Sequence, residues 1–166
     1  MTKRIVSGFF LSALLAAPAL AAVLPARLPG LWQSTTTVLG PNGKPLANAV
    51  NIVTVSCVDA VNDQIFFTSG QSACSSLKIS GRGNSYSIDG ACDDQGKTMR
   101  IHETLVYGAQ DLQLKAAYNG AAGQMTVESA LQWQGACPAG MQPGDEGSIT
   151  GGVFRKTDNI NDSGNQ

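Results

Sequence analysis

The feature that most constrains this chain is an alternation of apolar and polar side chains across residues 97–135. Nearly every second residue is apolar in three successive runs, Met99–Tyr107, Leu112–Tyr118 and Met125–Trp133. A period of two places those residues on one face of a β-strand. Short glycine-containing segments separate the runs, so the pattern predicts an antiparallel meander with one dry face and one wet face.

The first half of the chain also favours strands, although its alternation is less regular. Threonine enrichment indicates a strand in Trp32–Leu39, and apolar residues indicate a second in Val50–Cys57. Apolar residues on either side of Gly81–Asn84 predict a hairpin, and Asp59–Phe67 fits a short helix capped by Asp59. The expected inward side chains here are Val58, Val61, Ile65 and Phe66. We therefore expect an all-β fold: an antiparallel meander of about seven to eight strands that forms a small barrel or curved sheet, with one short helix.

The N-terminus has the pattern of a cleavable secretory signal. Lys3 and Arg4 precede the apolar run Ile5–Ala17, and Ala19–Ala21 has the small-x-small pattern that signal peptidase recognises. The run is shorter than the ~20 apolar residues that span a bilayer. We expect residues 1–21 to be a signal peptide and the protein to be exported without a stable membrane anchor.

The rest of the chain fits one domain by length. We expect a single β domain over residues 22–145 and a C-terminal extension over residues 146–166. The extension is expected to be largely disordered at its end, because Thr157–Gln166 is polar. With 11 Lys and Arg against 12 Asp and Glu, and no basic stripe, nucleic acid is not an expected partner.

The four cysteines are Cys57, Cys74, Cys92 and Cys137. An even number in an exported chain predicts two disulfides. A metal site is the weaker interpretation, because the spacing contains no Cys-x-x-Cys pair and the chain has a single histidine. Four cysteines allow three connectivities, and the count alone does not choose among them.

The predicted hairpin bears on this choice. Cys74 and Cys92 lie equally far from Gly83, but the alternation of apolar residues requires a pairing shifted by one position. A β-bulge at Ser75–Ser76 would reconcile the two demands. This favours Cys74–Cys92 together with Cys57–Cys137. The next alternative joins Cys57 to Cys74 and Cys92 to Cys137.

A search for catalytic and cofactor motifs returns none. The chain lacks a Gly-x-Ser-x-Gly elbow and a phosphate loop, and no second histidine follows His102–Glu103 at zinc-binding spacing. His102 would project from the polar face of its strand, where a solvated side chain is expected. We expect no enzymatic activity, no cofactor and no metal.

Glu103 is the one residue that contradicts the alternation, because its position assigns a carboxylate to the apolar face. A break in register could return it to water, or an arginine or a tyrosine hydroxyl could pair with it. Alternatively, it is a polar anchor inside a ligand cavity, whose aromatic walls would be Trp32, Tyr118 and Trp133. The alternative for those three rings is ordinary core packing.

Four short motifs occur in an order that resembles a known family. They are Pro29–Trp32 followed by Thr35–Thr37, then Val55–Ala60, then Cys74 and Cys92 around a hairpin, and finally Cys137–Asp145. Together they resemble the bacterial domain-of-unknown-function family 3617 over Leu28–Asp145. The resemblance implies an exported, periplasmic protein with a cysteine framework. It transfers no activity and no catalytic residue.

We therefore expect non-enzymatic binding of a small apolar ligand or of an envelope protein. One alternative is a structural or protein-interaction domain whose core is filled by its own side chains. Another is a hydrolase with an unrecognised site. A cavity beside the candidate aromatic residues would favour the first.

Overall fold

The computed structural model describes residues 22–68, 74–94, 96–120 and 123–162, so the expected signal peptide at 1–21 lies outside the described residues. Within these ranges the chain forms one helix and nine strands, one more strand than the largest number expected. The elements are β1 (Gly30–Leu39), β2 (Ile52–Val58), α1 (Asp63–Thr68), β3 (Cys74–Arg82), β4 (Ser85–Asp94), β5 (Lys97–Tyr107), β6 (Asp111–Gly120), β7 (Gly123–Gly135), β8 (Asp145–Thr150) and β9 (Val153–Asn159).

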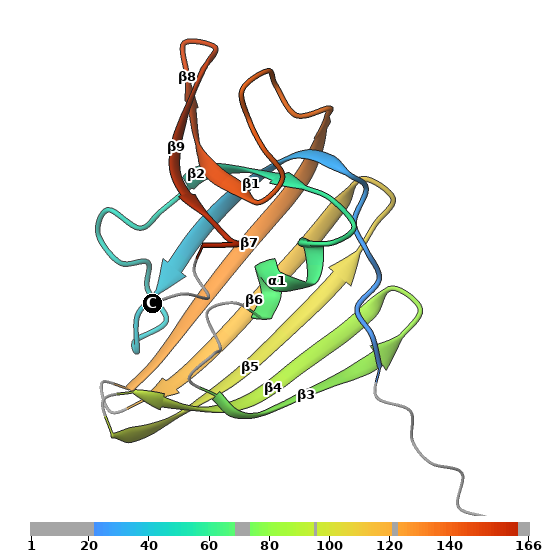
Figure 1. Ribbon diagram of the computed structural model, residues 1–166. Coiled ribbons are helices and arrows are strands. Elements are labelled where there is room, and N and C mark those ends of the chain that lie inside the picture. The colour runs from blue at the N-terminus through green and yellow to red at the C-terminus, as the bar shows by residue number, and fades with distance from the viewer. Residues whose placement is uncertain (1–21, 69–73, 95, 121–122, 163–166) are drawn as a thin grey trace, which may run out of the picture.

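All nine strands belong to one antiparallel sheet in the order β3-β4-β5-β6-β7-β1-β2-β8-β9. The sheet curves strongly around α1 but does not close, since β3 and β9 end the order without pairing to each other (Figure 1). The prediction of an all-β antiparallel fold with one short helix is confirmed, in its curved-sheet form. Strands β3 to β7 form a meander in sequence order, as the alternation predicted.

The first strand lies in the middle of the sheet rather than at its edge. β1 pairs with β2 on one side and with β7 on the other, where Trp32 lies opposite Trp133. The approach to β7 requires glycine at position 30, because its φ is +131° and an added Cβ would collide with the backbone oxygen of Gly135. The Pro-Gly-Leu-Trp motif therefore sets the start of β1 against the end of β7.

The main core lies on the concave face, beneath α1 and the segment that precedes β1. Its buried members come from the sheet, the helix and the N-terminal segment: Leu24, Trp32, Val58, Phe67, Ile88, Leu105, Leu112 and Leu131. α1 is shorter than expected and begins at Asp63 instead of Asp59. The expectation that Val61 faces inward is wrong, because its side chain precedes the helix and is 82% exposed.

A smaller core lies on the convex face, where the C-terminal hairpin β8–β9 continues the sheet beyond β2. Val55 and Cys57 are buried there with Met141, and Phe154 of β9 packs against them. The sheet therefore continues through β8 and β9, beyond residue 145 where the β domain was expected to end. The expected disorder from Thr157 onward is wrong for residues 157–159, which belong to β9, and residues 163–166 lie outside the described residues.

The cysteines form two disulfides, Cys57–Cys137 and Cys74–Cys92. The second joins β3 to β4 beside a register shift between Cys74 and Ser76, which is the bulge that the alternation required. The first ties β2 to the loop between β7 and β8, so it fastens the convex core to the centre of the sheet.

Candidate functional site

A cavity of about 320 Å³ lies between α1 and the concave face of the sheet. Aromatic rings, aliphatic side chains, two hydroxyls and one carboxyl line it: Thr36, Phe66, Phe67, Met99, Ile101, Glu103, Leu114, Tyr118, Val127 and Ser129. These residues come from β1, α1, β5, β6 and β7, so the curvature of the sheet brings them together. We call this space the concave cavity.

Glu103 is the carboxyl of the concave cavity. It lies opposite Ile88 of β4 and Ala116 of β6 in uninterrupted registers, so the interpretation of a register break is wrong. The residue is only 4% exposed, and its side chain makes no hydrogen bond or ion pair with any other described residue. Burial raises the pKa of this carboxyl from 4.5 to about 7. The interpretation of a pair with an arginine or a tyrosine hydroxyl is therefore wrong as well.

The hydroxyls of Thr36 and Ser129 line the cavity on its β1 and β7 side, and that of Ser34 continues the row outside the lining. The Ser34 and Thr36 hydroxyl oxygens are 3.1 Å apart, and the Thr36 oxygen is 2.8 Å from that of Ser129. Each residue occupies a position on the concave face where an apolar side chain would extend the core. Ser129 interrupts the apolar series of β7 in the sequence, and that interruption was the signal that could have located this wall.

Of the four aromatic and acidic residues proposed from the sequence, Glu103 and Tyr118 line the concave cavity. Trp32 and Trp133 do not line it, and both pack in the main core. Their indole Nε1 atoms donate to backbone oxygens, at 2.8 Å to Leu28 for Trp32 and at 3.1 Å to Pro29 for Trp133. The two rings therefore hold the segment before β1 against the sheet.

The aromatic residues of the cavity that the sequence did not identify as such are Phe66 and Phe67 of α1. A buried ion pair holds this helix in place: Arg27 Nε donates to Asp63 Oδ1 at 2.6 Å, and both side chains are 2% exposed. The Arg27 guanidinium lies 4.8 Å from the ring centre of Phe67 and 5.2 Å from that of Phe66. Arg27 thus fixes the roof of the cavity.

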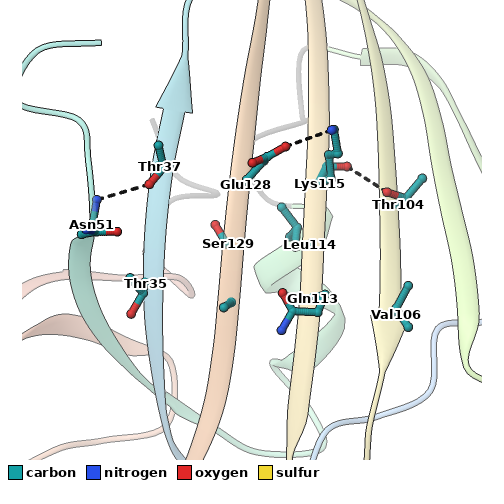
Figure 2. Close-up of a pocket in the computed structure, with 11 residues that line it drawn as sticks. Thr35, Thr37, Asn51, Thr104, Val106, Gln113, Leu114, Lys115, Glu128 and Ser129 are labelled. Carbon is teal, nitrogen blue, oxygen red and sulfur yellow. Dashed lines mark hydrogen bonds and ion pairs between the residues drawn. The ribbon is translucent and has the colours of Figure 1, made fainter. Parts of the chain in front are cut away.

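A second hollow, of about 470 Å³, lies on the convex face of the sheet. Figure 2 shows its side chains spread over β1, β7, β6 and β5, with Thr37, Glu128, Lys115 and Thr104 in a row. Lys115 Nζ and Glu128 Oε1 are 2.9 Å apart, and the two side chains are 62% and 46% exposed. Lys115 and Glu128 are exposed to water and neutralise each other, so the pair contains no buried charge that a ligand would have to match.

His102 also lies on the convex face. Its Nδ1 is 2.7 Å from Asp89 Oδ1, and both side chains are more than half exposed, at 55% and 52%. A serine hydrolase would also need a serine hydroxyl on this histidine, and no described serine hydrogen-bonds to it. Among the described residues, no three His, Cys, Asp or Glu side chains group closely enough to hold a metal ion.

Comparison with protein families matches residues 27–137 to the family described as "Protein of unknown function (DUF3617)". No curated protein and no solved structure matches the chain. Among the described residues, no helix has both the length and the apolar character needed to cross a membrane.

Proposed function

This chain belongs to the DUF3617 family of proteins of unknown function, and from that premise we propose that it is a non-enzymatic binding protein. It holds a small, mostly apolar ligand in the concave cavity, between α1 and β5, β6 and β7. The two disulfides fit an oxidising compartment, and we place the mature protein in the periplasm, with residues 1–21 as its cleaved signal.

One observation carries this proposal: Glu103 is buried at the cavity without a hydrogen-bonding partner among the described residues. Burying a polar group without a hydrogen bond costs about 1–3 kcal/mol, and a folded core normally avoids that cost. A ligand with one polar group and an apolar body would supply the missing partner and fill the space above Ile101, Leu114 and Val127.

The size of the cavity limits the ligand. A volume of about 320 Å³ lies at the lower end of the range of small-molecule sites, which is roughly 300–1,000 Å³. Most of the lining side chains are apolar or aromatic, which is typical of such sites. The arrangement supports a compact molecule rather than a peptide or a long acyl chain.

The test uses the neutral fluorescent probe N-phenyl-1-naphthylamine, whose emission rises in an apolar site, and two tryptophan substitutions on β7. Val127→Trp fills the concave cavity from its floor, whereas Ala130→Trp places the same side chain in the convex hollow. We expect the wild-type protein and Ala130→Trp to bind the probe, and Val127→Trp to lose binding while it keeps a cooperative melting transition.

Two results would contradict the proposal. One is the absence of any probe binding to the oxidised wild-type protein. The other is equal binding by the two variants, which would place the probe outside the concave cavity. Native mass spectrometry of protein purified from the periplasm provides a second measurement, and a bound small molecule that Val127→Trp no longer retains is the expected result.

A further inference from the structure

We infer that the ligand of the concave cavity carries a protonated amine, which pairs with the carboxylate of Glu103. This inference rests on the proposed function and names the chemical class of the ligand. It follows from the charges and rings that surround the cavity.

The charge balance of the cavity is the first argument. Glu103 is the only ionisable acid or base, tyrosine aside, among the described residues that line it. The guanidinium of Arg27 lies against the rings of Phe66 and Phe67, and its Nε pairs with Asp63 at 2.6 Å, while its Nη2 is buried without a partner. Among the described residues, no hydrogen bond or ion pair joins Arg27 or another cation to Glu103, and a cationic ligand would supply that partner.

The rings of the cavity give the second argument. Phe66 and Phe67 approach from α1 and Tyr118 from β6, so Glu103 has aromatic neighbours on two sides. The face of an aromatic ring carries partial negative charge and attracts a cation. A ring face repels the carboxylate of a ligand, and Glu103 repels it as well when Glu103 is ionised.

The hydroxyl wall provides the remaining hydrogen bonds. An ammonium group has three N–H donors and no acceptor. Its acceptors in the cavity are the Glu103 carboxylate and the hydroxyl oxygens of Thr36 and Ser129, which are 2.8 Å apart. The aliphatic side chains of Met99, Ile101, Leu114 and Val127 leave an apolar floor for the body of the molecule.

The inference also fixes how binding depends on pH, because the carboxyl must lose its proton to form the pair. The titratable groups that interact with Glu103 are the hydroxyls of Tyr107 and Tyr118, and the Arg27–Asp63 pair acts on Tyr107. Burial raises the pKa values of both tyrosines above their ordinary 10, so neither titrates between about pH 5 and pH 8. An alkylammonium also keeps its proton in that range.

The experiment compares three probes of equal length, octylamine, 1-octanol and octanoate, by isothermal titration calorimetry at about pH 8. We expect octylamine to bind at least about tenfold more tightly than 1-octanol, with octanoate weakest, because a charge-assisted buried hydrogen bond exceeds a neutral one by that factor. Glu103→Gln should lower octylamine affinity about tenfold or more and change 1-octanol affinity by less than about threefold. Glu128→Gln, on the convex face, is the matched control and should change neither.

Octylamine affinity for the wild-type protein should also fall by up to about tenfold per pH unit below about pH 7, whereas 1-octanol affinity should not. This profile decides the question even if Glu103→Gln does not fold. Equal affinity for the three probes, or a flat profile for octylamine, would overturn the amine and leave the binding function intact. If none of the three probes binds, and N-phenyl-1-naphthylamine does not either, the proposed function itself fails.

Discussion

Replacing Glu103 by glutamine should stabilise the protein at neutral and alkaline pH, because the wild-type fold holds this carboxyl in an unfavourable environment. Glutamine keeps the size and shape of a protonated glutamic acid, so packing beside Tyr118 and Phe67 is preserved. The difference between the two proteins then isolates the charge of one side chain.

The magnitude follows from the pKa of Glu103, which is about 7 in the folded protein against 4.5 for the free group. Below pH 4.5 both states carry the proton, and the group does not disfavour folding. As pH rises from 4.5 to 7, the unfolded chain loses its proton while the folded protein keeps it, so stability falls. The loss amounts to about 3 kcal/mol in the unfolding free energy and is complete above about pH 7.

The assay is urea unfolding of the oxidised wild type and Glu103→Gln at about pH 5 and about pH 8. We expect the wild type to lose about 2–3 kcal/mol more than the variant between these two values. Other groups with shifted pKa values, such as Asp145, are present in both proteins and cancel in the comparison. Parallel stability profiles for the two proteins would refute the reasoning, because they would mean that Glu103 is hydrated or paired.

Three other sets of substitutions test the contacts that hold the fold together. Asp63→Ala should lower the unfolding free energy by about 3–5 kcal/mol, since it leaves Arg27 buried without its partner. Adding Arg27→Met should restore part of that loss, and urea unfolding of the single and double variants measures it. Removing the Cys57–Cys137 disulfide, which spans 80 positions, should lower the unfolding free energy by about 4 kcal/mol. Removing Cys74–Cys92, which spans 18, should lower it by about 3 kcal/mol. The reverse order in chemical denaturation would contradict the loop-entropy argument. Phe154→Ala, in the convex core, should lower stability by about 1–3 kcal/mol, and a comparable loss for the 62% exposed Val153→Ala would show that the contact with Val55 contributes little.

The sequence predicted the strands where one face is dry and the other wet. β5, β6 and β7 follow their alternation residue by residue, since their registers bring Leu105 opposite Leu114 and Leu112 opposite Leu131. β8 and β9 lack that pattern, because they extend the edge of the sheet and leave most side chains in water. Phe154 is the one residue of these two strands that packs against the convex core, and a single apolar residue does not form a period.

The candidate site was predicted through its exception rather than through a motif. Glu103 is visible in the sequence because a carboxylate interrupts an apolar series, and Tyr118 follows from its place in the neighbouring strand. Trp32 and Trp133 were wrongly assigned to the cavity wall, because periodicity gives the face of a residue but not its height along a curved sheet. The place of Phe66 and Phe67 in the cavity depends on the position of α1. The pairing of Arg27 with Asp63, which lie 36 positions apart in the sequence, sets that position.

Because β1 lies between β7 and β2, the continuity of the sheet depends on the pairing of β1 with β7. Within the described residues, the pairing of β1 with β7 is the one ladder that joins the meander β3–β7 to β1, β2, β8 and β9. A nascent chain released before residue 123 therefore has β1–β2 and β3–β6 but no strand that joins these two parts of the sheet. A stop codon just before β7 would leave open the hydrogen-bonding edges of β6 and β1, both of which pair with β7 in the finished protein.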